Sequence, residues 1–155
     1  MPSPERPFDD TAPVERTEWL LRLVATGQYD HDRGDLLLGA LLPMTGDGDG
    51  LSLNREGAIA AADLLATSGN PIVRESGGVL AVSAGWLEEH GFPTSPDPAE
   101  VPGHVLVKGM NRIDYDSGGE KKKRIKAVAS ELLDRINQQG SIRIRPNRLP
   151  PPSGG

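Results

Sequence analysis

The spacing of apolar and polar residues changes along the chain, and its N-terminal half has the periodicity of helices. Apolar positions recur at intervals of three and four within residues 13–26, and Gly27 ends that pattern. A second, Leu-rich helix is expected between an aspartate cap at position 30 or 32 and Pro43. A third, Ala-rich helix is expected over residues 54–67. The pattern therefore predicts three consecutive helices.

Shorter apolar runs follow, and they favour strands. Residues 72–75 and 79–82 are typical of two strands, and Gly77 with Gly78 would supply the positive φ angles of a tight hairpin turn between them. Ser83 is expected to cap a short helix that continues to about His90.

The C-terminal part predicts a strand, a long helix and a second strand. Residues 105–107 form a short apolar run, and Ser117 with Glu120 three residues later has the spacing of a capping box. The helix that follows ends at Gly140, and residues 141–145 alternate as a final strand. One continuous apolar stripe runs along this helix and comprises Ile125, Val128, Ala129, Leu132, Leu133 and Ile136.

The order of three helices and a hairpin in residues 13–91 resembles the layout of a winged-helix domain. The expected fold class is α+β: a helical N-terminal part with a β-hairpin in this winged-helix-like layout, followed by a small basic β-α-β part over 104–145. A Pro-rich linker over 92–103 would join the two parts. Residues 1–12 are expected to be a flexible leader and residues 146–155 a disordered Pro-rich tail.

The winged-helix layout implies a groove-reading role for the third helix. Residues 54–67, however, offer only Asn54 and Arg55 as polar readers of DNA bases beside an alanine face. Modules of helices and a hairpin also bind proteins, so both kinds of partner stay open.

Charge divides the chain more sharply than its net charge of −5 suggests. Residues 1–100 hold six arginines and seventeen acids, which gives 6 − 17 = −11, whereas residues 101–155 hold eleven basic residues and five acids, which gives 11 − 5 = +6. Such a division indicates either an anionic partner for the basic part or packing of the two parts against each other.

The composition also excludes several classes of protein. The chain has no cysteine, which rules out disulfides, thiolate metal sites and a cysteine nucleophile. No apolar run is long enough to cross a bilayer, and the first residues lack the apolar core of a signal peptide. We expect a cytoplasmic protein without membrane association.

Four consecutive cations at the start of the long helix are the strongest candidate site. They are unfavourable there, because unpaired backbone N–H groups already place partial positive charge at a helix N-terminus. Two arginines share one face of the final strand and would extend the basic surface if the strand packs beside the start of the helix. The predicted nucleic-acid or anion site is Lys121, Lys122, Lys123, Arg124, Arg143 and Arg145.

Two other interpretations of these cations are open. They decorate a solvated helix face, offset by Asp114, Asp116 and Glu120, or they pair with an acidic protein partner or with the acidic first hundred residues of the same chain.

Two further segments resemble functional motifs in part. Residues 45–56 resemble an EF-hand calcium loop in their acids at loop positions three, five and twelve and their glycine at six, but Thr45 replaces the first aspartate. Residues 81–85 have the setting of a nucleophile elbow, although capping a helix is a simpler role for Ser83.

The sequence thus predicts a small, non-enzymatic, cytoplasmic binding module that contacts nucleic acid through its basic C-terminal region. The alternative is a protein-interaction adaptor whose basic region pairs with an acidic partner. We expect no catalytic residue, cofactor or metal ligand, and the oligomeric state stays open.

Overall fold

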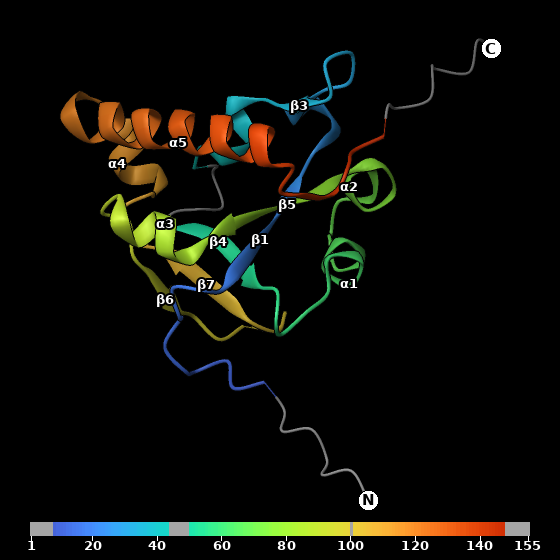
Figure 1. Cartoon of the computed structure of the whole chain (residues 1–155), viewed down its shortest axis with the longest axis horizontal. Coiled ribbons are helices and arrows are strands. Elements are labelled where there is room, and N and C mark those ends of the chain that lie inside the picture. Colours follow the sequence, from blue (N-terminus) through green and yellow to red (C-terminus); the bar gives the residue numbers. More distant parts are fainter. Residues whose placement is uncertain (1–7, 44–49, 100, 148–155) are drawn as a thin grey trace, which may run out of the picture.

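The computed structural model describes residues 8–43, 50–99 and 101–147 and is built around one antiparallel sheet (Figure 1). The order of the strands across the sheet is β6-β7-β4-β1-β5-β8, and each pairs antiparallel with its neighbours. The strands are β1 (Trp19–Val24), β4 (Leu51–Arg55), β5 (Gly78–Ser83), β6 (Thr94–Pro96), β7 (His104–Val107) and β8 (Ile142–Ile144). A separate two-stranded sheet pairs β2 (Tyr29–Asp30) with β3 (Asp35–Leu36).

Helices cover both faces of the six-stranded sheet. The longest, α5, crosses one face, whereas α1 and α2 lie on the opposite side (Figure 1). The helices are α1 (Ala61–Ala66), α2 (Pro71–Ser76), α3 (Ala84–Glu89), α4 (Arg112–Ser117) and α5 (Gly119–Gln139), with 3-10 turns η1 (Thr26–Gln28) and η2 (Leu38–Leu41).

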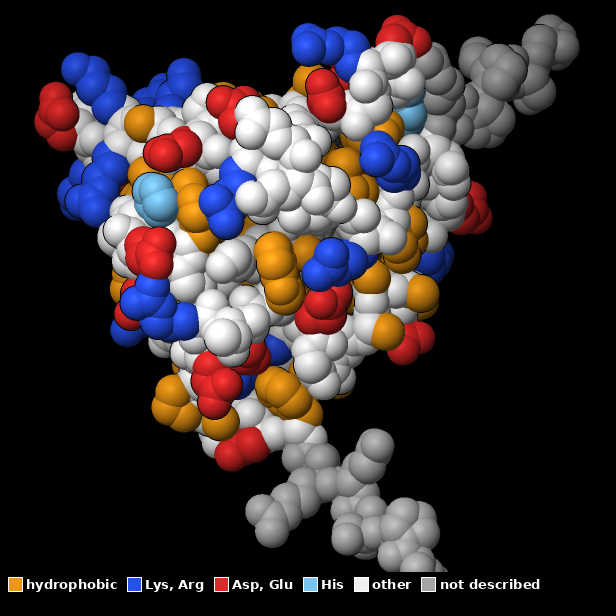
Figure 2. All heavy atoms as spheres, viewed as in Figure 1, with side chains coloured by type: hydrophobic (Ala, Val, Ile, Leu, Met, Phe, Trp, Pro, Cys, Tyr) orange, Lys and Arg blue, Asp and Glu red, His pale blue; other side chains and the backbone are white. Residues whose placement is uncertain are grey.

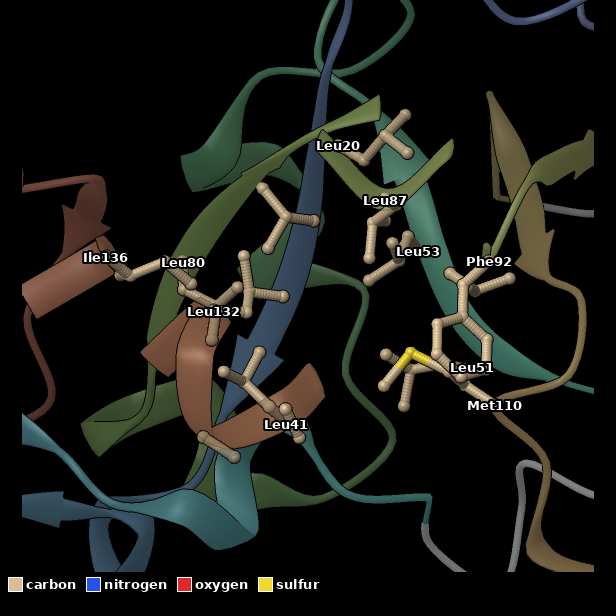
Figure 3. Packing of buried hydrophobic residues seen from close by; sticks show 14 of the residues in the cluster. Leu20, Leu41, Leu51, Leu53, Leu80, Leu87, Phe92, Met110, Leu132 and Ile136 are labelled. Atoms are coloured by element: carbon tan, nitrogen blue, oxygen red, sulfur yellow. The ribbon is translucent and has the colours of Figure 1, made fainter. Parts of the chain in front are cut away.

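The main core lies between the sheet and α5. Alternate residues of the central strands point to this face, and Leu80 of β5 lies beside Leu132 and Ile136 of α5 (Figure 3). Phe92 and Met110 pack with Leu51 in another part of the same cluster (Figure 3). A smaller cluster on the opposite face joins β1 and β5 to α1. The sheet is therefore buried on both faces at its centre.

The predicted helical N-terminal part is wrong, because strands, 3-10 turns and irregular segments stand where long helices were expected. Residues 19–24 form β1 at the centre of the sheet, and the predicted third helix is divided between β4 and α1. A strand with both faces buried carries apolar residues at consecutive positions, as Leu20 and Leu21 do, and such a run has no clear period of two. The winged-helix layout is thus excluded.

The predicted hairpin over 72–82 is also wrong, for a local reason. Pro71 fits the first turn of α2, and the side chain of Asn70 accepts hydrogen bonds from the backbone amides of Ile72 and Val73. The Asn-Pro pair therefore starts a helix where a strand was expected. Gly78 lies inside the sheet, where a Cβ would overlap the carbonyl oxygen of Ile144, so it permits close packing instead of forming a turn.

The expected separate β-α-β part is wrong, because both of its strands, β7 and β8, belong to the six-stranded sheet. β7 lies between β6 and β4, whereas β8 pairs with β5 at the far edge, so the two strands on either side of α5 are not neighbours. Residues 94–96, expected within the linker, form the opposite edge strand, β6.

The ends of the described chain contact the folded body. The Phe8 ring lies against Arg55, and the Asn147 amide donates a hydrogen bond to the Ser76 carbonyl. Most of the predicted leader and tail, residues 1–7 and 148–155, lies outside the described residues.

The apolar stripe on the long C-terminal helix is confirmed. Ile125, Ala129, Leu132 and Ile136 of α5 are buried, and Val128 and Leu133 are half-buried beside them. Gly140 ends the helix in the left-handed conformation, with φ of 68°.

Two arginines are buried in the sheet, and each ties a neighbouring segment to it. Arg22 of β1 donates from Nε to the Ala40 carbonyl at 2.9 Å and from Nη1 to the Ser52 carbonyl at 3.2 Å, which fixes η2 beside the core. Arg55 of β4 forms two hydrogen bonds of 2.7 Å with the carboxylate of Glu18 and a third of 2.7 Å with the carbonyl of Ala12. The N-terminal segment is held against β4 by these bonds.

The first prediction concerns the α5 stripe. Leu132→Ala should lower the free energy of unfolding by about 2–5 kcal/mol, because the side chain is fully buried and its loss leaves a cavity. Leu133→Ala, at a half-buried position of the same helix, should cost clearly less. Urea denaturation of both variants measures the difference. Equal losses would contradict the packing described for α5.

The second prediction concerns the pair of Glu18 and Arg55. Burial alone would raise the pKa of Glu18, but hydrogen bonds from the Arg55 guanidinium and the Glu15 amide outweigh it and hold the pKa below its ordinary value. Glu18→Gln should lower the free energy of unfolding at pH 7 by about 3 kcal/mol, because it leaves a buried guanidinium without its counter-charge.

This loss should depend on pH in a defined direction. The folded-state pKa lies below the unfolded value of about 4.3, so the contribution of Glu18 is complete above that pH and disappears as the pH falls through the folded-state pKa. The gap between the wild type and Glu18→Gln should therefore narrow from pH 7 toward pH 3 in urea denaturation. A constant gap would assign the effect to packing instead of charge.

Candidate functional site

The predicted cation cluster lies where α4 and α5 meet, at one end of the molecule. We call this surface the basic corner and define it as Lys108, Arg112, Lys121, Lys122, Lys123, Arg124 and Lys126. Residues 108–126 contain these seven cations and three acids, which gives 7 − 3 = +4. Lys and Arg side chains gather around this end of α5, at the left of the view (Figure 2).

Local sequence signals build the corner. The side chain of Asn111 accepts a hydrogen bond of 2.7 Å from the Asp114 amide and caps α4. Gly118 and Gly119 then take φ angles of 71° and 67°, which lets the chain turn between the two helices. The predicted capping box of Ser117 and Glu120 is wrong, because the Ser117 hydroxyl donates to the Asp114 carbonyl instead.

Three cations of the corner have acidic partners close to them in the sequence. The Nζ of Lys121 lies 3.3 Å from a carboxylate oxygen of Asp114, and the Nζ of Lys123 lies 3.6 Å from one of Glu120. The Nε of Arg112 lies 3.0 Å from a carboxylate oxygen of Asp116. Hydrogen bonds from the Asn111 side chain and from Lys121 hold the pKa of Asp114 below its ordinary value. Exposed pairs of this kind contribute little to stability, so they are easily exchanged for another anion.

Aromatic rings support other cations of the corner. The Nζ of Lys122 lies 5.1 Å from the centroid of the Tyr115 ring, and the guanidinium carbon of Arg124 lies 5.2 Å from that of Phe92. Within the described parts of the chain, no carboxylate pairs with Lys122, Arg124 or Lys126. These cations therefore have no acidic partner in the described chain, and two of them lie over aromatic rings.

A small pocket of about 190 Å³ opens beside Arg124. Lys121 and Asp114 line it together with Phe92 and two glycines, Gly91 and Gly109, whose φ angles are 84° and 88°. A Cβ at Gly91 would overlap the Arg124 guanidinium, and one at Gly109 would lie 3.1 Å from the Phe92 ring. The glycines thus leave room for the guanidinium over the ring and for a small anion next to it.

The other two predicted residues lie elsewhere. Arg143 forms two hydrogen bonds with Glu56, of 2.6 and 3.0 Å, and these bonds raise its pKa further. Arg145 donates to the Tyr29 hydroxyl at 2.7 Å and to the Gly34 carbonyl. Both follow the C-terminal end of α5, whose 21 residues span about 30 Å. The structure therefore brings together the four predicted cations of α5, and a continuous stripe to β8 does not form; contact with nucleic acid stays a prediction for all six.

Sequence reasoning missed the groups that support the cluster. Arg112 and Lys126 flank it in the sequence, and a count of the charges around residues 121–124 would have included them. Phe92 had no such signal, because it comes from a segment between α3 and β6 that contacts α5 only in the folded chain.

The other motif segments have structural roles where they are described. Residues 45–49 of the loop compared with an EF-hand lie outside the described residues, and 51–55 form β4. Ser83 caps α3 by accepting a hydrogen bond from the Trp86 amide, as predicted. Among the described residues, no three His, Asp or Glu side chains converge to hold a metal ion.

Comparisons with protein-family models, with curated proteins and with solved structures found no match. None of the helices in the described ranges combines the length and the apolarity needed to span a bilayer.

The third prediction tests the pocket wall. Gly91→Ala should lower the free energy of unfolding by about 1–2 kcal/mol, because a residue with a Cβ is strained at φ of 84°. The loss should be similar in an Arg124→Ala background, since the flexible end of Arg124 can move aside. Urea denaturation of the wild type, the two single variants and the double variant gives the free energy of coupling between Gly91→Ala and Arg124→Ala. A much larger loss with Arg124 present would show that the guanidinium is fixed over Phe92.

Proposed function

We propose that this chain is a non-enzymatic, cytoplasmic module that binds nucleic acid through the phosphate backbone at its basic corner. One observation carries the proposal: Lys122 and Arg124 lie over aromatic rings without a carboxylate partner in the described chain, and Arg124 lines a pocket of about 190 Å³, large enough for a small anion. The lack of cysteine in a chain of 155 residues agrees with a reducing compartment.

The chemistry of the corner suits phosphate groups. The planar guanidinium of Arg124 offers paired N–H donors to two oxygens of one phosphate, and lysines act as point charges around it. Asp114 lies in the same pocket but already accepts hydrogen bonds from Asn111 and Lys121, which lessens its repulsion of an incoming anion. Contacts from lysine and arginine to phosphates carry no sequence information, so we expect binding with little sequence preference.

The number of uncompensated cations sets the expected salt dependence. Four cations of the corner, Lys108, Lys122, Arg124 and Lys126, have no carboxylate partner within the described chain. If each contacts one phosphate of a duplex, the logarithm of the binding constant should fall with the logarithm of the salt concentration with a slope of about −3 to −4. Binding of this kind is weak at physiological salt and clear at low salt.

An adaptor for an acidic protein is the second candidate, and one observation favours it. Ile113 of α4 follows Arg112 directly in the sequence and is 70% exposed. A large apolar side chain next to cations is suited to anchor an acidic protein partner.

The fourth prediction distinguishes binding at the basic corner from a general effect of the net charge of the protein. Lys122→Gln with Arg124→Gln should weaken binding to DNA or RNA oligonucleotides by at least about tenfold in 50 mM salt and flatten the salt slope by about 2. The matched control, Arg33→Gln with Arg74→Gln, removes the same charge from the β2–β3 turn and from α2. Mobility shifts with duplex DNA, single-stranded DNA and RNA at two salt concentrations measure both.

Each alternative outcome has a defined meaning. Equal weakening by both double variants would assign binding to net charge alone. Failure of the wild type to shift any nucleic acid at low salt would reject the proposal and leave the adaptor, for which Ile113→Ser should abolish binding to an acidic protein partner.

A further inference from the structure

A second concave site lies between the N-terminal segment and the ends of β1 and β4. This N-terminal pocket has a volume of about 520 Å³, within the range of about 300–1,000 Å³ that is usual for sites of small ligands. Arg55 and Glu18 form part of its wall, and the segment that they anchor supplies much of the rest. The site shares no residue with the basic corner.

Aromatic side chains are exposed in this pocket. Phe8 is 39% exposed and Trp19 is 37% exposed, and both line the pocket. The other large apolar side chains that are exposed in the described chain, Leu37, Ile72 and Ile113, are aliphatic and lie elsewhere. The two most exposed aromatic side chains of the described chain are thus gathered at one concave site, where burial by a ligand would be favourable.

The lining of the pocket is strongly acidic. Four acids, Asp9, Glu15, Glu18 and Glu56, line the pocket with the single cation Arg55, and Arg143 next to the lining pairs with Glu56, which gives 2 − 4 = −2. Hydrogen bonds from the Thr11 hydroxyl and amide hold the pKa of Asp9 below its ordinary value, so this acid stays ionised at neutral pH. Within the described residues, the Glu15 carboxylate has no ion-pair partner. The pocket therefore retains negative charge that its own cation does not neutralise.

Two arginines of the chain already contact the rings and carboxylates of this site. The guanidinium carbon of Arg55 lies 4.7 Å from the Phe8 ring centroid, and the guanidinium is paired with Glu18. The guanidinium carbon of Arg143 lies 5.4 Å from a ring centroid of Trp19, and this guanidinium is paired with Glu56. Twice at one site, a planar cation is held by one aromatic ring and one carboxylate.

We propose that the N-terminal pocket binds an organic cation, the guanidinium or ammonium group at the end of an arginine or lysine side chain in a basic peptide. Exposed rings supply the cation–π surface, and Glu15 supplies the unpaired carboxylate. Aromatic walls favour an organic cation over a metal ion, which requires several converging oxygen ligands. This inference is independent of nucleic-acid binding, because the acidic lining would repel phosphate.

The test uses the two tryptophans of the full chain as reporters. Trp19 lines the pocket, whereas Trp86 is buried in the core, so their indole N–H signals in a ¹⁵N–¹H correlation spectrum report on different places. We expect the Trp19 signal to move on titration with a peptide that contains one arginine and one lysine, and the Trp86 signal to stay in place. Potassium chloride at equal ionic strength is the salt control.

Variants locate the binding site. Glu15→Gln and Phe8→Leu should each weaken peptide binding by about threefold to tenfold, in line with the usual strength of a single charge or cation–π contact. Glu88→Gln removes the same charge from an exposed position on α3 and should leave the affinity unchanged. Dispersed spectra of the free variants confirm that they are folded.

Titration with N-acetyl-arginine amide and with tetramethylammonium distinguishes a free small cation from a peptide. Binding of these probes as tight as that of the peptide would support a free small cation as the ligand, and tighter binding of the peptide would support the peptide. No movement of the Trp19 signal with any of these cations at concentrations up to about 100 mM, which exceeds the dissociation constant of a contact at the upper end of cation–π strength, would overturn the proposal. Equal weakening by Glu15→Gln and Glu88→Gln would overturn it as well.

Discussion

Burial of one side of α5 against the sheet determines where the charges of the C-terminal region lie. The stripe from Ile125 to Ile136 must face the strands, so the rotation of the helix about its axis is fixed and its first turn extends beyond the packed part. A fully buried large apolar side chain contributes about 1.5–3 kcal/mol, whereas a cation at the wrong end of a helix costs about 0.3–1 kcal/mol. Packing therefore outweighs the local preference against Lys121–Arg124, and the basic corner is exposed as a result.

Buried arginines connect the irregular segments to this packed body. Arg22 lies on the core side of β1 and donates to carbonyl groups of η2 and β4. Arg55 likewise donates to the Ala12 carbonyl and so fixes the N-terminal segment. A guanidinium is suited to this role because its five N–H donors reach several carbonyl groups at once. The N-terminal pocket exists because Arg55 draws Ala12 and Glu18 toward β4. The same guanidinium thus supports the fold and shapes a site.

The sequence predicts the C-terminal elements better than the N-terminal ones, and the reason is physical. The stripe of α5 has one buried side and hence a clear period, whereas β1 is buried on both faces and has none. The cation cluster was found because its four members are consecutive, but its support by Phe92 depends on a contact between distant segments. Arg143 and Arg145 alternate as predicted, yet strand order places them at the far end of α5, beside acceptors that no local pattern specifies.

The antiparallel pairing of β4 with β7 has an electrostatic consequence. Leu51 lies opposite Val107 and Asn54 opposite His104, so the acidic pocket next to Arg55 and the basic corner that begins at Lys108 lie at opposite ends of this strand pair. Separated charges of opposite sign at these two sites contribute an electric dipole along the strands. A polyanion would exert a torque on that dipole before any contact forms and turn the basic corner toward itself. The molecule would then arrive already oriented, with its acidic pocket directed away and open to a different partner.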